Sequence, residues 1–203
     1  MKEHGLTKRQ VVYLFFKRLL DIIFSFIGII ILIPIFILVS ILVKCTSKGP
    51  ILYLQYRTGK NKKEFRIIKF RTMKKDAPEL PAIDLTDSEQ KKILTCVGGF
   101  LRQTSIDELP QVFNILVGQM SFIGPRPAMI VNHDGVVDER DKYVPSPNAL
   151  RPGLSGYAQT HGRNHEVKLK AELDYYYAKN LSFKLDVIIF FLTIKKLFLF
   201  NGR

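Results

Sequence analysis

The sequence is poor in cysteine. Its two cysteines, Cys45 and Cys96, lie far apart and match neither a C-x-x-C redox motif nor a zinc-binding pattern. We therefore expect both to be buried thiols in a protein of a reducing compartment. His161 and His165 are spaced four residues apart, but a glycine lies between them and no third ligand is obvious, which argues against a transition-metal site.

The common nucleotide-binding and nucleic-acid-binding motifs are absent. The chain has no G-x-x-x-x-G-K-[ST] motif and no G-x-G-x-x-G motif, so the sequence supports neither a P-loop nor a Rossmann site. It also has no helix-turn-helix, zinc-finger or aromatic RNA-binding motif. No internal repeat or low-complexity tract divides the 203 residues, so we expect one domain of catalytic size with appendages.

Acidic residues are scarce relative to basic ones. The chain has 31 Lys and Arg against 18 Asp and Glu, and the resulting net charge of +13 indicates a polyanionic partner. Nucleic acid, an anionic membrane surface and a phosphorylated substrate all meet that description. The excess is concentrated between residues 51 and 75, where nine basic residues accompany Glu64 as the one acid. Residues 51–57 and 64–73 are rich in β-branched and aromatic residues, which predicts a β-hairpin with these two strands and a basic loop between them.

Charge is missing altogether from residues 22–43. A helix of these 22 residues, at about 1.5 Å per residue, is long enough to cross a hydrocarbon core of about 30 Å. Basic residues flank the segment on both sides, which would keep both flanks cytoplasmic. Pro34, near the middle, could bend the helix so that the chain returns to the leaflet it entered. A re-entrant helix hairpin and a kinked single span both fit this pattern.

Two adjacent carboxylates, Asp107 and Glu108, stand out in this basic chain. Ser105 and Glu108 match a capping box before a helix that ends at Gly118, so one interpretation is that the acids only cap a helix. A chemical interpretation is also available, because a carboxylate in a phosphate-binding site either holds Mg²⁺ or attacks phosphorus to form an acyl phosphate. The cations that would neutralise the phosphates are Lys69, Arg71, Arg102 and Arg126.

Arg126 is placed between two prolines, Pro125 and Pro127, in the stretch FIGPRPAM at 122–129. This stretch predicts a rigid turn that presents the arginine. An arginine held in this way suits bidentate binding of a phosphate or a carboxylate better than a flexible surface charge does.

Several motifs then occur in the order found in one family. They are KRLLDIIFS at 17–25, GP at 49–50, KFRTM at 69–73, FLRQTSIDELPQ at 100–111, GPRPA at 124–128, RPGLSGYAQTHGRN at 151–164 and NLSFKLD at 180–186. On these motifs the chain resembles the bacterial sugar transferases, the small monotopic phosphoglycosyl transferases. The resemblance implies transfer of a phosphosugar from a UDP-sugar to a polyprenyl phosphate such as undecaprenyl phosphate, with release of UMP. This reaction begins the assembly of capsule, exopolysaccharide, O-antigen or glycoprotein glycans.

The resemblance also implies roles for individual residues. Asp107 matches the family's nucleophile and Mg²⁺ ligand, and Glu108 matches a supporting acid, base or metal-orienting residue. Three cations match phosphate-binding positions, and the Arg126–Pro127 turn matches the uridine side of the donor. The substrate-binding candidates are Lys69, Arg71, Arg102, Arg126, Pro127, Arg151, Gln159, Arg163 and Asn164. The last four lie in one motif and are candidates for the rim of the active site, although a purely structural turn explains them equally well.

The family further implies a helix-dominated α+β monotopic membrane protein with a re-entrant membrane helix, a small β-hairpin and interfacial amphipathic helices. We divide the chain into a membrane anchor at 1–48, a catalytic domain at 49–182 and a C-terminal interfacial helix and tail at 183–203. The anchor would be broken at Pro34, where the preceding Ile33 replaces the serine common in the family. The catalytic domain would lie on the cytoplasmic face of the bacterial inner membrane. The apolar run 187–194 could also be a buried core helix.

Two other classes would explain parts of the sequence. A membrane-tethered nucleic-acid-binding protein would also be basic, and a membrane scaffold without catalysis would also have an anchor and an amphipathic tail. Neither class uses the Asp107–Glu108 motif. The lack of nucleic-acid-binding motifs argues further against the first, so we expect no nucleic-acid partner.

Overall fold

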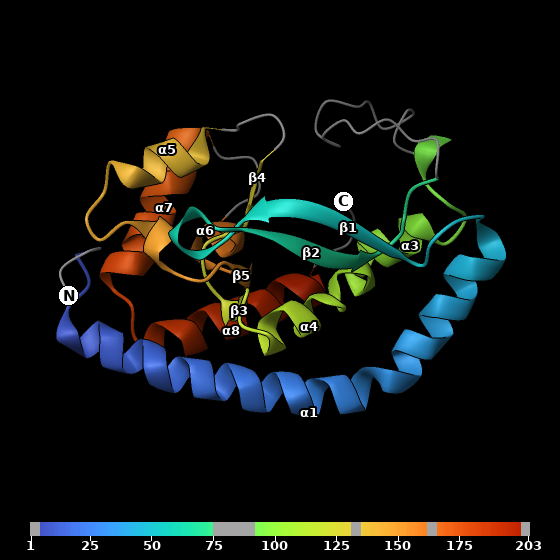
Figure 1. Ribbon diagram of the computed structural model, residues 1–203, viewed down its shortest axis with the longest axis horizontal. Coiled ribbons are helices and arrows are strands. Elements are labelled where there is room, and N and C mark those ends of the chain that lie inside the picture. The colour runs from blue at the N-terminus through green and yellow to red at the C-terminus, as the bar shows by residue number, and fades with distance from the viewer. Residues whose placement is uncertain (1–4, 75–91, 131–134, 162–165, 200–203) are drawn as a thin grey trace.

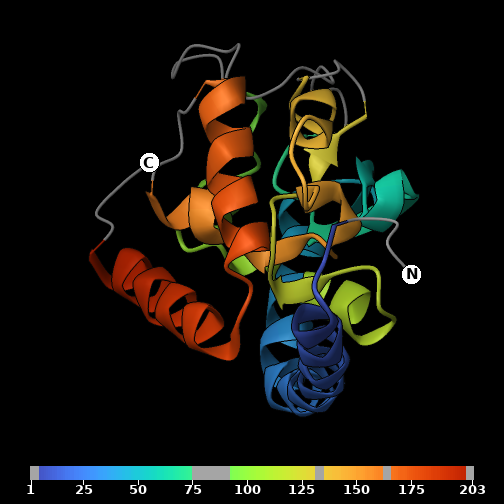
Figure 2. The same ribbon diagram turned by 90° about the vertical axis from the view of Figure 1, so that its left-hand side faces the viewer.

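A computed structural model of the chain describes residues 5–74, 92–130, 135–161 and 166–199 (Figure 1). Helices dominate the fold and a small β-hairpin lies near its centre, which confirms the prediction of a helix-dominated α+β protein. The longest element is α1, Lys8–Thr46, which runs beneath the rest of the molecule in this view. Figure 2 shows α1 nearly end-on, with the hairpin and most of the shorter helices stacked on one side of it.

The helix α1 begins with a capping box. The backbone N–H of Gln10 donates to Thr7 Oγ1 (3.3 Å), and the backbone N–H of Thr7 donates to Gln10 Oε1 (2.9 Å). Pro34 lies inside the helix and does not interrupt it, although α1 bends and its C-terminal part turns towards α3 (Figure 1). The anchor is therefore one bent helix, and its path relative to a membrane stays a prediction.

The predicted hairpin is confirmed. β1, Leu52–Thr58, and β2, Glu64–Phe70, pair antiparallel along their whole length, and the 3-10 helix η1, Lys60–Lys62, lies in the turn between them. β4, Ala128–Met129, pairs antiparallel with the end of β1, so the sheet order is β2-β1-β4. This pairing brings the segment after the Pro-Arg-Pro turn to the edge of the hairpin.

The remaining elements surround the hairpin. β3, Ser121–Ile123, pairs parallel with β5, Gly153–Ser155. The helical elements are α3 (Gly98–Gln103), η3 (Ile106–Glu108), α4 (Gln111–Leu116), α5 (Val136–Asp141), η4 (Pro147–Ala149), α6 (Tyr157–His161), α7 (Val167–Lys179) and α8 (Phe183–Leu199). α5 packs against α7 at the upper left of Figure 1.

Apolar packing holds the hairpin between α1 and the short helices. One buried cluster contains Val39, Val43, Phe70 and Leu101, and a second contains Phe65, Ile67, Ile115 and Met120. Alternate residues of a strand share a face, so Lys69 lies on the same face of β2 as Ile67. The hydrophobic residues of this strand therefore fix where Lys69 emerges.

Polar side chains attach the first half of α1 to the rest of the molecule. Gln10 donates to two backbone carbonyls at the C-terminal end of α7, and Arg18 donates to two at the C-terminal end of α4. Lys17 forms an ion pair with Asp186 of α8, and Asp21 accepts a hydrogen bond from a backbone N–H of β3 (3.2 Å). These contacts fix α1 against four separate elements.

The outward side of α1 is apolar and exposed. Its side chains that are more than half exposed include Val12, Phe15, Phe16, Phe24, Phe26, Ile30, Ile31, Ile37, Leu38 and Ile41. α8 also exposes phenylalanines, at positions 183, 190 and 191. Of the helices in the described part of the chain, α1 alone is long and apolar enough to cross a membrane. An exposed apolar surface of this extent marks contact with lipid or with another protein, and it supports membrane association.

Two local predictions are wrong. Ser105 has a left-handed backbone conformation (φ 58°) and makes no capping hydrogen bond with its side chain, so the segment forms the short helix η3 before α4 instead of one capped helix. Cys45 and Cys96 are free and exposed rather than buried. For Cys45 the cause is helical geometry, because α1 buries Val39 and Val43, four residues apart, and Cys45 lies off that face.

Candidate active site

Five of the predicted site residues line one open depression: Lys69, Glu108, Arg126, Pro127 and Gln159. They come from β2, η3, the turn before β4 and α6, which lie far apart in the sequence. Arg57, Ile67, Gln111, Gly153 and Leu154 complete the lining. The depression thus combines three basic side chains, one carboxylate and two amides, which is a composition suited to binding a polar anion.

Two of the lining residues, Lys69 and Glu108, form an ion pair. Lys69 Nζ donates to Glu108 Oε1 at 2.7 Å, and the two side chains are 18% and 21% exposed. The pair joins β2 to η3 and holds both groups at the edge of the depression. Since each remains partly accessible, an arriving anion or cation can exchange with one partner without opening the fold.

Asp107 lies next to this pair but is more deeply placed. It is buried, with 7% of its surface exposed, on the short helix η3. The preceding Ser105 has φ 58°, a conformation that a non-glycine residue rarely adopts, so the chain turns sharply before the carboxylate. A strained turn that positions a buried carboxylate beside a basic depression is a feature often found at functional sites. Asp107 does not itself line the depression.

Arg126 is presented as the sequence predicted, exposed between the buried Pro125 and Pro127. Its backbone carbonyl accepts a hydrogen bond from Arg140 Nη2 at 3.0 Å. The Arg140 guanidinium also donates to Asp174 Oδ2 through Nε (3.0 Å) and Nη2 (2.5 Å). Burial raises the pKa of the Asp174 carboxyl above its usual range, and the charge of Arg140 opposes that shift.

The Arg140–Asp174 pair is a part of the site that sequence reasoning missed. Arg140 belongs to α5 and Asp174 to α7, so their distance in sequence gave no local pattern. Two lining residues were also missed. Arg57 donates to Gln55 Oε1 and more weakly to the Pro127 carbonyl. Gln111 is the last residue of the motif that contains Asp107, and this position in the motif could have indicated it as a site residue.

Gln159 offers an unused acceptor to the depression. Its Nε2 donates to the Leu154 carbonyl at 3.3 Å, while its buried Oε1 has no hydrogen-bond partner in the described part of the chain. A buried amide oxygen without a donor costs free energy, so its presence here favours a ligand that brings an N–H or O–H group.

The other predicted residues lie elsewhere. Arg71 is buried and donates to the carbonyls of Ser47 and Lys48 just beyond α1, both at 2.7 Å, so its guanidinium serves the end of that helix. Arg102 Nε donates to Thr72 Oγ1 at 3.1 Å. Arg151 lines a different cavity and donates to the Gly118 carbonyl at 2.9 Å. The last two predicted residues, Arg163 and Asn164, lie outside the described residues.

Asp107 and Glu108 are the carboxylates available to a Mg²⁺ ion at this site. Within the described residues no group of three or more His, Cys, Asp or Glu side chains is placed to hold a metal. A pair of carboxylates is nevertheless enough, because Mg²⁺ is usually bound by one or two protein carboxylates together with substrate phosphates and water. Asp107 and Glu108 supply two such carboxylates from η3, of which Glu108 lines the depression and Asp107 does not, so the donor types fit Mg²⁺ and joint coordination of one ion is a proposal.

The chain is similar to known bacterial proteins over most of its length. The model of the bacterial sugar transferase family matches residues 12–200. The chain is 40% identical over 191 residues, 91% of its length and 44% of the relative's, to a UDP-N-acetylgalactosamine-undecaprenyl-phosphate N-acetylgalactosaminephosphotransferase of Aeromonas hydrophila. It is 38% identical over 190 residues, 91% of its length and 40% of the relative's, to a UDP-glucose:undecaprenyl-phosphate glucose-1-phosphate transferase of Klebsiella pneumoniae.

A third relative is similar to the chain in length. The exopolysaccharide production protein PSS of Rhizobium leguminosarum bv. phaseoli is 36% identical over 186 residues, which cover 88% of the chain and 92% of that protein. By contrast, the chain spans about two fifths of the length of the Aeromonas and Klebsiella relatives. With the match over residues 12–200, these similarities confirm the resemblance seen in the motifs, and the chain belongs to the bacterial sugar transferase family.

Proposed function

We propose that the protein transfers a phosphosugar from a UDP-sugar to a polyprenyl phosphate, releases UMP and thereby begins the assembly of a bacterial glycan. The observation that carries this proposal is the depression in which Lys69, Glu108 and Arg126 meet beside the buried Asp107. The names of the Aeromonas and Klebsiella relatives include a nucleotide sugar and undecaprenyl phosphate, which supports the same reaction class here.

The basic residues of the depression would bind the donor diphosphate. Lys69, Arg126 and Arg57 carry the positive charges of the lining, and Lys69 is paired with Glu108. Neutralising the donor's negative charge is necessary before a carboxylate can approach phosphorus, because the two would otherwise repel each other. The free Oε1 of Gln159 would accept a hydrogen bond from an N–H or hydroxyl of the nucleotide or the sugar.

Asp107 would act as the nucleophile. A carboxylate oxygen of Asp107 attacks the β-phosphorus of the donor, the bond from that phosphorus to the bridging oxygen breaks, and UMP leaves with the electron pair. An oxygen of the polyprenyl phosphate then attacks the same phosphorus, and the acyl phosphate bond breaks to regenerate the Asp107 carboxylate. Burial of Asp107 would protect the acyl phosphate from water between these steps.

Glu108 and a divalent ion would support these steps. Its ion pair with Lys69 holds Glu108 at the edge of the depression, where it can orient the donor or a metal. Bound Mg²⁺, held by Asp107 and Glu108, would neutralise charge on the transferring phosphoryl group.

The experiment that tests the proposal omits the acceptor. Full-length protein in detergent, incubated with Mg²⁺ and a panel of UDP-sugars, should release a single equivalent of UMP and retain a phosphosugar on the peptide that contains Asp107. Asp107→Asn should abolish both the adduct and turnover. Asp138→Asn, which removes an exposed carboxylate of α5, should leave both unchanged.

A different order of products would contradict the covalent route. If UMP were released only when polyprenyl phosphate is present, and no adduct could be trapped, the acceptor would attack the donor directly. If no UDP-sugar gave UMP with acceptor and Mg²⁺ present, the proposed reaction itself would be wrong.

A further inference from the structure

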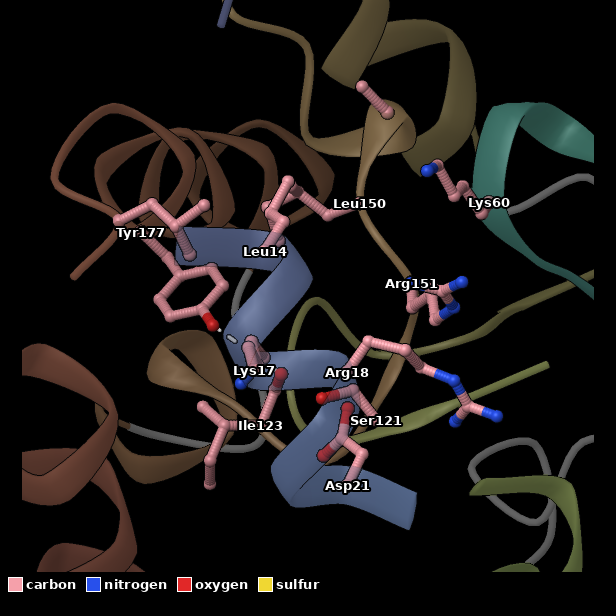
Figure 3. A pocket seen from close by; sticks show the side chains of 12 residues that line it. Leu14, Lys17, Arg18, Asp21, Lys60, Ser121, Ile123, Leu150, Arg151 and Tyr177 are labelled. Atoms are coloured by element: carbon pink, nitrogen blue, oxygen red, sulfur yellow. Dashed lines mark hydrogen bonds between the residues drawn. The ribbon is translucent and has the colours of Figure 1, made fainter. Parts of the chain in front are cut away.

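A second, partly open cavity lies between α1, the hairpin turn and the segment that precedes β5 (Figure 3). None of its lining residues lines the depression described above. Its polar lining comes from four separate parts of the chain: Lys17, Arg18 and Asp21 of α1, Lys60 of η1, Ser121 of β3, and Arg151 just before β5. The rest of the lining is mainly apolar, with residues such as Leu14, Leu150 and Tyr177.

Positive charge exceeds negative charge in this cavity. Four basic side chains line it, whereas Asp21 is the one acid in the lining. Two of the basic groups have partners, since Lys17 pairs with Asp186 and Arg18 donates one N–H each to the carbonyls of Ile115 (2.6 Å) and Leu116 (2.7 Å). The carbonyls carry no charge that would neutralise the Arg18 guanidinium, and Asp21 offsets part of that charge.

Lys60 and Arg151 have no acidic partner in the described part of the chain. Within the described residues, the Arg151 side chain donates one hydrogen bond, from Nε to the Gly118 carbonyl. Partial removal of water around the Lys60 ammonium, followed by repulsion from the charge of Arg151, lowers the pKa of Lys60. Two like charges are therefore held towards one cavity without a counter-charge between them.

The hairpin turn holds Lys60 in place. The next two residues, Asn61 (φ 54°) and Lys62 (φ 61°), have left-handed backbone conformations that non-glycine residues rarely adopt. An ion pair between Lys62 and Asp141 of α5 fastens the turn. Backbone strain of this kind persists only where the surroundings impose it, and it is common where a loop serves a ligand.

We propose that this cavity binds a phosphate-class oxyanion, a phosphate monoester or diester group, between Arg18, Lys60 and Arg151. An anion there would relieve the repulsion between Lys60 and Arg151 and would accept hydrogen bonds from both. The site is separate from the proposed active site and does not depend on the proposed reaction.

Two sources of such an oxyanion exist. The uncharged run of α1 starts at Ile22, one helical turn from Arg18, or about 6 Å along the axis. If that run enters a bilayer, the cavity lies at the depth of the headgroups, and an anionic phospholipid headgroup can supply the phosphate. A soluble phosphate can reach the same cations from the aqueous side.

The test compares two charge-equivalent substitutions in the same turn. Lys60→Gln removes a cavity cation, and Lys63→Gln removes an exposed lysine three residues away that does not line the cavity. Both are made in an Arg126→Gln background, so that phosphate bound in the depression contributes little. In one arm, full-length protein in detergent is titrated with inorganic phosphate at constant ionic strength, and the unfolding midpoint reports binding. In the other, native mass spectrometry measures retention of phosphatidylglycerol against phosphatidylcholine.

We expect Lys60→Gln to weaken binding on the order of ten-fold, since a hydrogen bond to a charged group is lost, while Lys63→Gln stays close to the Arg126→Gln background. Weakening in the phosphate arm supports a site open to soluble phosphate, and selective loss of the phosphatidylglycerol adduct supports a headgroup site. Equal effects of the two substitutions in both arms would overturn the proposal. Retention of full affinity by Lys60→Gln combined with Arg151→Gln would overturn it as well.

Discussion

Replacing Asp174 by asparagine tests whether a buried ion pair holds the arginine turn of the candidate active site. Arg140 and Asp174 are 6% and 2% exposed, and the same Arg140 guanidinium donates to the backbone carbonyl of Arg126. Asp174→Asn leaves the guanidinium buried without a counter-charge. Arg140, whose guanidinium donates to the Arg126 carbonyl, is then no longer held in a fixed position.

The expected effect on stability is large. Breaking a buried pair by removing one partner lowers the free energy of unfolding by about 3–5 kcal/mol. For a chain of this size, that corresponds to an unfolding midpoint lower by about 6–20 °C. On α5, the helix that carries Arg140, Glu139→Gln removes the partner of the exposed Lys142, and we expect no measurable change in the midpoint.

A double variant separates stability from positioning. Arg140→Met combined with Asp174→Leu replaces both charges by apolar groups, and such replacements of a buried pair are often neutral or stabilising. It still removes the donor to the Arg126 carbonyl. We therefore expect near-parental stability together with a kcat/KM for UMP release that is lower by roughly ten- to a hundred-fold, because a displaced binding group costs activity.

Thermal unfolding in detergent and UMP release with saturating acceptor check both parts. A midpoint for Asp174→Asn equal to that of Glu139→Gln would refute the reasoning about the buried pair. Parental activity in the stable double variant would refute the claim that Arg140 positions Arg126.

Further predictions concern charge, metal and topology. Arg126→Lys keeps the charge but loses the bidentate fork, so kcat/KM for UMP release should fall at least about ten-fold with little change in the unfolding midpoint. Excess chelator should abolish UMP release and added Mg²⁺ should restore it; full activity in chelator would remove the metal role from Asp107. Probes of accessibility should find residues 5–15 and the hairpin turn on the same side of the membrane. Pro34→Leu should shift α1 towards a straight span with the two flanks on opposite sides, and unchanged labelling would contradict the role of the proline.

The sequence predicted the parts of the site that depend on local pattern. The β-branched and aromatic residues of the two strands and the basic turn between them were enough to place the hairpin, and the two prolines around Arg126 were enough to predict a rigid turn that presents the arginine. The pairing of Lys69 with Glu108 follows once both lie at one edge of the hairpin. The motifs that contain these two residues had already indicated both as site candidates.

The failures came from backbone conformation and from distant partners. A capping box needs an N-cap in extended conformation, and nothing in the neighbouring sequence indicates that the backbone of Ser105 is in the left-handed conformation. Arg71 and Arg151 matched family motifs, yet each donates to carbonyls remote in sequence, which spacing does not reveal. The pair Arg140–Asp174 is separated by 34 positions and depends on the packing of α5 against α7.

These placements change what the net charge of +13 indicates. Arg18 serves the C-terminal carbonyls of α4, and Arg71 serves the carbonyls that follow α1, where the helix dipole favours a cation. Such arginines contribute to the positive field, but their N–H groups attach α1 to the rest of the fold. Arg18 does so in the first half of the helix and Arg71 just beyond its C-terminal end. Because α1 is fixed in this way, the distance of the candidate site from the apolar face of α1 is set by the fold. In the proposed reaction, a lipid acceptor would therefore have to bring its phosphate to the depression, since α1 is not free to move independently and deliver it.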